Sequence, residues 1–509
     1  MPKNLIEETH AQARGLFGSL PSGELRRQSV VGGAVTVFSQ LAKLVLQTLS
    51  TIVMARLLAP EQFGLVGMVM AVTGVFVIIR DAGLSTATVR SEVISHEQVS
   101  TLFWINSGLG FALALLAALL APLIAAFYHE PRLVMVTIAL ASTSIFSGIS
   151  AQHQALLQRQ MRFPVLAVIE IISLSTGIAV GVVMGLRGFG LWALVGMQIA
   201  QCFVSCVATL VALPWVPGPP RIASDMKSML RFSGFLTGSN LMAYMFRNTD
   251  NVLIGWYWGA GPLGLYSKAY GLLMLPITQV NSPISGVAVP ALSRVQSDPE
   301  RFRRYFLGGY SIAASVVLPI VMALFIFADE VIYVMLGPKW TPAVHLFRLL
   351  APAAISGALL NPFGWIFMSM GRTDRQFRFA ILWSCLVICA FAAGLPFGPE
   401  GVAAGYSLMS CLLGLPLCFY AVKGTTISVR DLFQAILPPL VGVLIAAICG
   451  LALKFGPLAS APAAMRGIAG CAAVLAVYSF VLLVVMRRWS FYRELLKQLL
   501  PARFANGLV

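Results

Sequence analysis

Long apolar segments joined by short polar turns constrain this chain more than any other feature of its sequence. A helix that crosses a bilayer needs about 20 predominantly apolar residues. That criterion predicts fourteen such helices in the 509 residues. The expected spans lie roughly at 30–55, 63–80, 101–127, 133–152, 164–186, 190–213, 232–257, 263–292, 305–328, 342–370, 379–395, 401–421, 434–453 and 464–486. The sequence therefore predicts an all-α integral membrane protein.

Composition agrees with this prediction and excludes several classes of protein. Only 11% of the residues are charged and 58% are hydrophobic, whereas a soluble domain carries about a quarter charged residues. The net charge is +16, but no basic run is interleaved with aromatic residues, so we expect no nucleic-acid partner. The connections between spans are too short for a catalytic domain, and we expect no enzymatic activity.

The eight cysteines give no sign of a metal site. All lie in apolar segments, and Cys202/Cys206 and Cys385/Cys389 have helical i, i+4 spacing. No histidine or carboxylate accompanies either pair, whereas a structural zinc site needs four ligands. We interpret them as small apolar packing residues and expect no metal and no cofactor.

Basic residues predict the orientation of the chain in the membrane. Of the 35 Lys and Arg residues, 25 fall on the side that holds both ends of the chain, six on the other side and four within spans. Cytoplasmic loops are enriched in Lys and Arg. We therefore expect both termini in the cytoplasm.

An internal repeat with an offset of about 200 residues organises the predicted helices. "SQL" at 39–41 and "FGL" at 63–65 correspond to "SNL" at 239–241 and "LGL" at 263–265. Since six spans precede the second copy, the two lobes would share one orientation, as in transporters built from parallel repeats. The predicted parts are a cytoplasmic N-terminal tail (1–29), an N-lobe of spans 1–6 (30–225), a C-lobe of spans 7–12 (226–425), an extra helix pair (426–486) and a cytoplasmic amphipathic tail (487–509).

Three stretches carry a resemblance to a known family. They are "ARLLAPEQFGLVGMVMAVTG" (55–74), "RDAGLSTATVRSEVISHEQVSTLFWINSGLG" (80–110) and "PALSRVQSDPERFRR" (290–304). The chain resembles Wzx-type polysaccharide exporters, which are lipid-linked oligosaccharide flippases of the superfamily that also holds multidrug antiporters and peptidoglycan-precursor flippases. The resemblance covers most of residues 30–425.

The resemblance implies a function, a location and partners. It implies transport of undecaprenyl-diphosphate-linked oligosaccharide repeat units across the bacterial inner membrane, for exopolysaccharide, capsule or lipopolysaccharide assembly. It also implies alternating access between two lobes, contact with membrane lipids, and a polysaccharide polymerase and chain-length machinery as partners. The sequence contains no G-x-x-x-x-G-K-[ST] phosphate loop. We therefore expect no ATPase domain, so the transport would be secondary.

Two other functions stay open on the sequence. A multidrug or cation antiporter of the same superfamily would favour acidic residues in its cleft, whereas the charges within these spans are mostly basic. A membrane polysaccharide polymerase or ligase would need large, charged outer loops, and the predicted outer loops are short.

Six ionisable residues lie within predicted spans, where each would cost at least about 2.5–3.5 kcal/mol if it faced lipid. They are Lys43, Glu170, Arg247, Asp250, Lys268 and Arg348. We expect them to face protein or a water-filled cleft, where cations would compensate a diphosphate. The candidate substrate-binding residues are therefore Lys43, Arg247, Lys268 and Arg348.

Five of these six ionisable residues have a second interpretation. Arg247 could form a structural pair with Asp250 at i, i+3 spacing, and Lys268 and Arg348 could snorkel to the outer interface. Glu170 could be a proton or sodium site or a partner for a cation of its lobe. Because carboxylates within membrane spans often mark ion or proton pathways, Asp250 and Glu170 are the candidate ion-coupling residues.

Three prolines, Pro276, Pro283 and Pro290, recur every seven residues in the predicted span 263–292. Each removes one backbone hydrogen bond and bends the helix. We expect a hinge that bends during access switching, or else a static kink. Asn281 and Ser285 are among the nearby polar residues expected to satisfy the freed carbonyls.

Basic residues are expected at the predicted cytoplasmic surface. They are His153 and Arg159, after the fourth span, and "RFRR" at 301–304. We expect them to meet anionic lipid head groups there, or else to receive the diphosphate as it enters.

Overall fold

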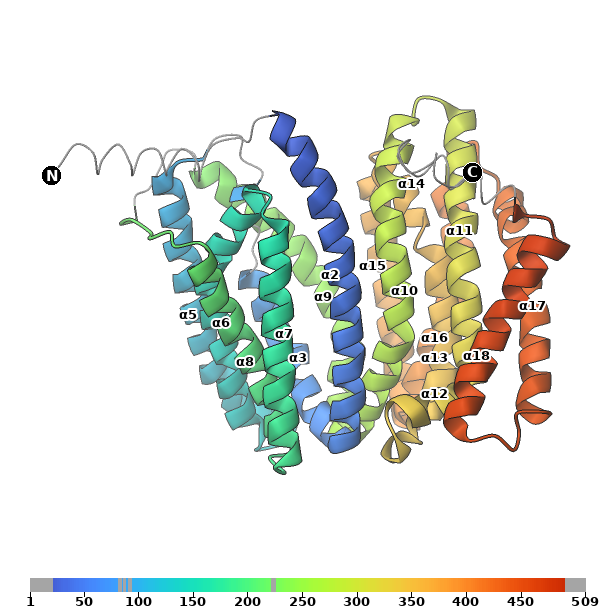
Figure 1. Cartoon of the computed structure of the whole chain (residues 1–509), viewed down its shortest axis with the longest axis horizontal. Helices are drawn as coiled ribbons and strands as arrows, with labels where there is room; N and C mark the ends of the chain where they lie inside the picture. Colours follow the sequence, from blue (N-terminus) through green and yellow to red (C-terminus); the bar gives the residue numbers. More distant parts are fainter. Residues whose placement is uncertain (1–21, 81–84, 86–87, 90–93, 221–225, 490–509) are drawn as a thin grey trace. The chain divides into compact units, whose positions relative to one another are not determined.

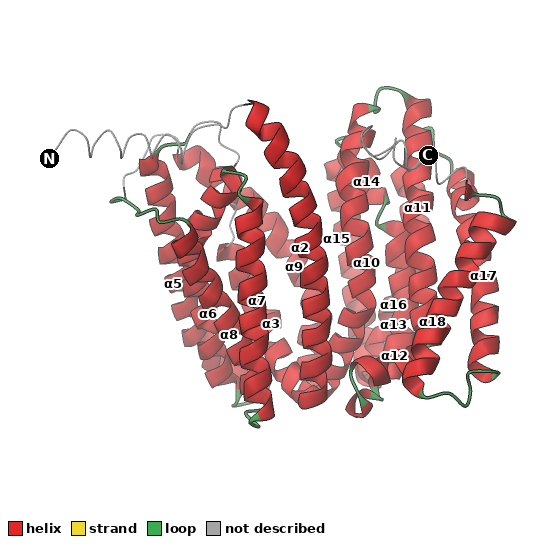
Figure 2. Cartoon of the chain, in the orientation of Figure 1, coloured by secondary structure: helices red, strands yellow, loops and turns green. Residues whose placement is uncertain are grey.

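The described part of the chain is helical throughout. The computed structural model describes residues 22–80, 85, 88–89, 94–220 and 226–489. Figure 2 shows helices and connecting loops, with no strand among these residues. Most of both predicted tails and part of the segment 80–110 that carries the family resemblance lie outside the described residues.

The helices follow one another along the chain with short connections (Figure 1). In the first half they are α2 (Ser22–Leu57), α3 (Pro60–Arg80), α5 (His96–Phe127), α6 (Leu133–Arg159), α7 (Phe163–Leu186), α8 (Leu191–Ala212) and α9 (Met226–Trp258). In the second half they are α10 (Ala260–Arg294), α11 (Pro299–Ile326), α12 (Ala328–Met335), α13 (Ala343–Leu360), α14 (Phe363–Ser369), α15 (Thr373–Gly394), α16 (Gly398–Val422), α17 (Val429–Phe455) and α18 (Ala463–Phe480). Every predicted span coincides with one of these helices or with a helix pair.

The number of membrane-crossing helices is close to the prediction. Twelve stretches of the described residues are long and apolar enough to cross a bilayer. α9, which carries Arg247 and Asp250, is not one of them, and one stretch, 373–422, holds both α15 and α16. The count of fourteen spans stays a prediction.

Two local features depart from the simple pattern of uninterrupted spans. The predicted span 342–370 is two helices, because α13 ends at Leu360 and α14 starts after Pro362. Pro362 has no amide hydrogen, so it cannot donate the backbone hydrogen bond that would continue α13. The short helix α12 lies in a connection that was predicted to be a loop.

Corresponding polar residues begin the third helix of each repeat. The Ser95 hydroxyl accepts from the amide of Gln98 at 3.2 Å, and the Gln98 side chain accepts from the amide of Ser95 at 2.9 Å, so α5 opens with a capping box. Asp298 caps α11 by accepting from the amide of Arg301 at 3.1 Å. Each of these two helices therefore begins at a side-chain cap.

The chain forms two compact units, Met1–Gly264 and Leu265–Val509. In the first unit α5 packs against α6, α7 packs against α2 and α8, and α3 contacts both α6 and α9. The Tyr244 hydroxyl of α9 donates to the carbonyl of Met70 on α3 at 2.7 Å. α9 thus packs with the first unit, whereas the predicted C-lobe began at residue 226.

Two glycines of the repeat meet inside the first unit. A Cβ on Gly64 would lie 1.7 Å from the carbonyl oxygen of Ala260, and a Cβ on Gly264 would lie 1.9 Å from that of Pro60. The starts of α3 and α10 therefore touch through their backbones. Because 60 pairs with 264 and 64 with 260, the contact is symmetric under the offset of 200.

The extra helix pair belongs to the second unit, where α17 packs against α11 and α18. At the start of α17, Asp431 receives two hydrogen bonds from Arg303 of α11, at 2.7 and 3.0 Å. Two parallel bonds from one guanidinium fix both the distance and the orientation of the carboxylate. This pair fastens α17 at one of its ends.

Candidate functional site

Lys43 of α2 forms an ion pair with Glu170 of α7, within the first unit. Their side chains are 30% and 39% exposed. Both residues come from predicted spans, and two opposite charges that share one site avoid most of the cost of an isolated intramembrane charge. The pairing supports the interpretation of Glu170 as the partner of a cation of its lobe.

Arg247 of α9 is exposed, and its Nε donates to the carbonyl of Ala243 one turn earlier, at 3.2 Å. It makes no ion pair with any residue that the structure describes. The alternative in which Arg247 and Asp250 form a structural bridge is therefore not found. Four of the five guanidinium N–H donors are left for solvent or a ligand.

Asp250 has a different environment on the same helix. It is 5% exposed and accepts from the amide of Asn251 at 2.8 Å. Asn248 and Asn251 lie beside it, with a 3.5 Å contact between their side chains. The middle of α9 thus carries a polar stripe that includes a buried carboxylate and an exposed guanidinium.

The second unit holds Lys268 and the three prolines, all on α10. Lys268 is half-buried. Pro276, Pro283 and Pro290 lie inside one continuous helix. The Ser285 hydroxyl accepts from the indole of Trp365 at 2.8 Å, and the side-chain oxygen of buried Asn281 has no partner among the described residues. The substrate role of Lys268 and the hinge role of the prolines stay predictions.

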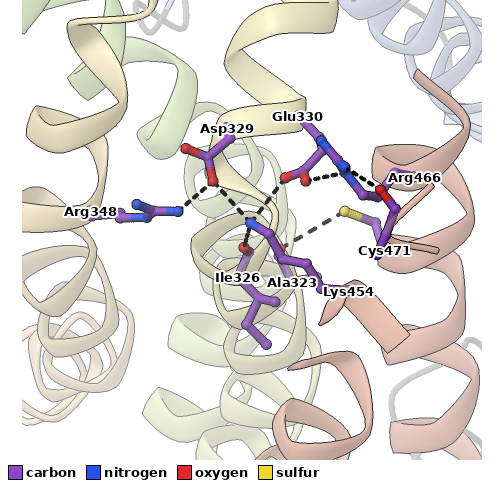
Figure 3. A network of polar contacts seen from close by, with 9 residues as sticks. Ala323, Ile326, Asp329, Glu330, Arg348, Lys454, Arg466 and Cys471 are labelled. Carbon is purple, nitrogen blue, oxygen red and sulfur yellow. Dashed lines mark hydrogen bonds and ion pairs between the residues drawn. The ribbon is translucent and has the colours of Figure 1, made fainter. Parts of the chain in front are cut away.

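Arg348 of α13 belongs to a network of ion pairs in the second unit (Figure 3). Its guanidinium lies 2.5 Å from a carboxylate oxygen of Asp329, and the Lys454 ammonium lies 2.9 Å from the same oxygen. Lys454 also contacts Glu330 at 3.2 Å, and Arg466 contacts Glu330 at 2.6 Å. The network joins α12 to α13, α17 and α18.

Glu330 lies at the centre of this network, where it contacts both Lys454 and Arg466. Its side chain is only 1% exposed. A buried carboxylate needs compensating charge, and Lys454 and Arg466 provide it from both helices of the extra pair. Burial raises the pKa of the neighbouring Asp329 carboxyl, but Lys454 and Arg348 lower it by more, so it ends below its ordinary value. The adjacent acids Asp329 and Glu330, in a chain with few carboxylates, were the sequence signal for this network.

His153 contradicts the expectation that it meets lipid head groups. Its side chain is 2% exposed, and its Nε2 lies 3.1 Å from the carbonyl of Trp215. The Trp215 indole donates to Nδ1 of His96 at 3.1 Å. The two histidines hold the segment after α8 against α5 and α6, because burying an aromatic ring between them removes apolar surface from water.

Metal chemistry finds no support in the residues that the structure describes. No group of three or more His, Cys, Asp or Glu residues there could hold a metal ion.

Comparison with known proteins identifies the family. The polysaccharide biosynthesis protein family matches residues 53–345. TuaB, the teichuronic acid biosynthesis protein of Bacillus subtilis strain 168, is 29% identical over 71% of this chain and 76% of its own length. WzxC, the lipopolysaccharide biosynthesis protein of Escherichia coli K12, is 26% identical over 78% and 82%. ExoT, the succinoglycan biosynthesis transport protein of Rhizobium meliloti strain 1021, is 26% identical over 91% and 93%.

Solved structures show the same fold. The lipid II flippase MurJ in its inward closed conformation matches 92% of this chain and all of its own, with a TM-score of 0.70 and 16% identity. An inward-facing multidrug transporter of the MATE family matches 74% of this chain and 93% of its own, with a TM-score of 0.59 and 14% identity. The all-α transporter fold predicted from the sequence is thus confirmed. Because its family match covers more than half of its residues, the chain belongs to the polysaccharide biosynthesis protein family, the Wzx-type exporters, and is a multi-pass membrane transport protein rather than an enzyme.

Proposed function

We propose that this chain is a secondary transporter, a flippase that moves undecaprenyl-diphosphate-linked oligosaccharide repeat units across the inner membrane by alternating access. The relatives take part in the synthesis of several different polysaccharides, teichuronic acid, lipopolysaccharide and succinoglycan among them. What such substrates would share is the lipid-linked diphosphate, not the sugar. A binding site for such substrates would therefore recognise the anionic diphosphate.

The exposed Arg247 is the observation that supports this proposal most. An arginine in the middle of a helix of a membrane transporter is costly unless it meets water or an anion. Arg247 has no ion-pair partner in the described part of the chain, and its planar fork suits two phosphate oxygens. We assign to it the first contact with the diphosphate.

Lys43 takes a conditional part in binding. While Glu170 is ionised, its negative charge compensates the positive charge of Lys43, so Lys43 attracts an anion only weakly. If Glu170 takes up a proton, the Lys43 charge becomes available to the diphosphate. In this proposal Glu170 is the ion-coupling carboxylate, and Asp250 is a second candidate because it is buried on the same helix as Arg247.

We no longer include Arg348 among the proposed substrate-binding residues, whereas Lys268 remains one of them. The Arg348 charge is already matched by Asp329 in the network of Figure 3. An arginine committed to a carboxylate would have to break that pair before it could bind substrate, so a structural role suits it better.

A multidrug antiporter is the rival function within the same fold. The likeness to MATE transporters concerns the fold alone. The cationic substrates of a multidrug antiporter would be repelled by the exposed Arg247, because bringing two like charges together in a low-dielectric site costs several kcal/mol. No observation in this chain favours that alternative.

The test of the function is a deletion strain followed by extraction of its lipids. We expect undecaprenyl-diphosphate oligosaccharide to accumulate on the inner leaflet, and the intact gene to restore polysaccharide export. Accumulated sugar would also identify the repeat unit. Normal export without the gene, and no accumulated lipid, would contradict the proposal.

Placement in the inner membrane with both termini in the cytoplasm belongs to the same proposal, as do the predicted lobes and the polymerase and chain-length partners.

The orientation can be tested with the single substitutions Lys339→Cys and Lys423→Cys. These two positions lie on loops that the alternation of spans puts on opposite sides of the membrane. We expect a membrane-impermeant thiol reagent, added to intact spheroplasts, to label the first and not the second. The eight native cysteines must first be replaced by Ala or Ser.

A further inference from the structure

An apolar cavity of about 400 Å³ lies inside the second unit, among α11, α13, α16 and α17. Its walls include Tyr310, Phe325, Leu360, Leu415 and Phe433. One of its few polar residues, Ser356, donates its hydroxyl to the carbonyl of Ser410 at 2.7 Å. A cavity lined in this way offers a ligand little besides apolar contact.

The cavity is elongated along the helices. Its α13 wall extends from Ala351 to Leu360, which is roughly 14 Å at 1.5 Å per residue. One leaflet of a bilayer has a hydrocarbon thickness of about 15 Å. The cavity therefore has the length of a single lipid acyl chain, and is too short for the much longer undecaprenyl chain.

The side of the cavity is open to the surroundings of the helices. Leu415 and Phe433, on either edge, are each 54% exposed, and Phe325 is 38% exposed. In a membrane-spanning protein such apolar edges face lipid. A lipid chain can thus enter sideways from the bilayer.

Two cations lie where the helices around the cavity end. Lys423 follows the end of α16, five residues beyond the cavity-lining Cys418, and Arg430 is next to the cavity-lining Val429. Both are exposed, and neither forms an ion pair with a residue that the structure describes. Arg303, by contrast, is held by Asp431. The apolar cavity thus ends beside uncompensated positive charge.

We propose that this cavity binds one anionic phospholipid of the surrounding membrane, with an acyl chain along α13 and the phosphate between Lys423 and Arg430. The site lies within one unit, and none of its residues is among the proposed substrate contacts on α2, α9 and α10. Each basic residue near the surface strengthens the binding of an anionic lipid. The two cations together should give phosphatidylglycerol a roughly thirtyfold preference over phosphatidylcholine.

The apolar half of the proposal is tested by filling the cavity. A Cβ on Gly414 would lie 3.7 Å from the Leu360 side chain, an ordinary contact, so Gly414→Leu adds its side chain to the cavity. Gly357 is exposed and has nothing within 4 Å of an added Cβ, so Gly357→Leu is the matched control. Native mass spectrometry of the full chain with added phosphatidylglycerol should show one retained lipid in the wild type and in Gly357→Leu, and a loss of at least tenfold in Gly414→Leu.

The contribution of Lys423 and Arg430 to lipid binding has its own test, which holds even if Gly414→Leu fails to fold. The double variant Lys423→Gln/Arg430→Gln should bind phosphatidylglycerol and phosphatidylcholine equally, whereas Lys339→Gln, an exposed cation of another connection, should keep the preference. No retained lipid in the wild type, or equal retention by both glycine variants, would overturn the proposal. So would displacement of phosphatidylglycerol by undecaprenyl phosphate at equal concentration, because the cavity would then belong to the substrate.

Discussion

Gly64 and Gly264 are 200 residues apart in the sequence and face each other where the starts of α3 and α10 touch. A Cβ on either would lie within 2 Å of a backbone carbonyl oxygen of the other helix. Cβ atoms do not approach other atoms so closely, and only glycine allows this contact. The structure thus gives physical meaning to "FGL" and "LGL", which in the sequence were a weak similarity.

Replacing Gly64 by leucine should separate α3 from α10. Overpacking of a tight contact costs typically about 1–3 kcal/mol, and a clash with backbone places this change at the upper end. We expect a lower melting temperature of the purified protein and reduced folded yield. Gly261→Leu, three residues from the partner glycine, has nothing within 4 Å of its Cβ and should leave both quantities nearly unchanged.

Arg247 variants separate binding from folding. Arg247→Ala should reduce polysaccharide export at equal protein level by at least about tenfold, since a hydrogen-bonded charged partner contributes about 1.5–3 kcal/mol. Arg247→Lys should retain part of the export, because it keeps the charge and loses the fork. The melting temperature should not change, and Arg187→Ala, an exposed loop cation of the same unit, should export normally. Full export by Arg247→Ala would exclude it from the site.

The Lys43–Glu170 pair predicts a charge-swap result. Each single reversal, Lys43→Glu or Glu170→Lys, puts two like charges together and should lower the free energy of unfolding by about 1 kcal/mol, since both side chains are partly exposed. The double reversal should restore the melting temperature. It should not restore export, because the cation would then stand on α7 rather than α2. Recovery of export by the double variant would make the pair purely structural.

The network in Figure 3 predicts unequal effects of its two carboxylates. Glu330→Gln leaves Lys454 and Arg466 without their buried partner, and breaking a buried pair costs about 3–5 kcal/mol. Asp329→Asn should cost much less, because that side chain is 49% exposed. Thermal unfolding should rank Glu330→Gln as the more damaging change. Similar losses for the two variants would argue against the central position of Glu330.

Acid should weaken two contacts outside the spans. The pKa values of Glu130, which bonds to Arg132, and of Asp329 are both held below their ordinary values. A carboxyl with a lowered folded-state pKa stabilises the protein above its unfolded-state pKa, near 4, and this contribution is lost as the pH falls through the folded value. The melting temperature should therefore fall as the pH drops below about 4, and Asp329→Asn should reduce that fall. An unchanged pH profile in this variant would contradict the assignment.

The class of protein and the positions of its helices were readable from the sequence alone. A bilayer forces every backbone polar group to be satisfied within its own helix, so long apolar runs determine where helices lie. The predicted boundaries of α7 and α8 differ from the observed ones by a single residue. Two local features differ from the prediction. Pro362 divides the predicted span 342–370 into two helices, and the short helix α12 lies in a connection between predicted spans.

Pairing between distant side chains was decided only by the tertiary structure. Lys43 and Glu170 are 127 residues apart, and Lys454 reaches Asp329 across 125. The sequence showed that these charges needed partners, since an intramembrane charge is costly. It could not show which, because an ion pair depends on the packing of two helices to within about an ångström, and several cations could have met each carboxylate with similar energy.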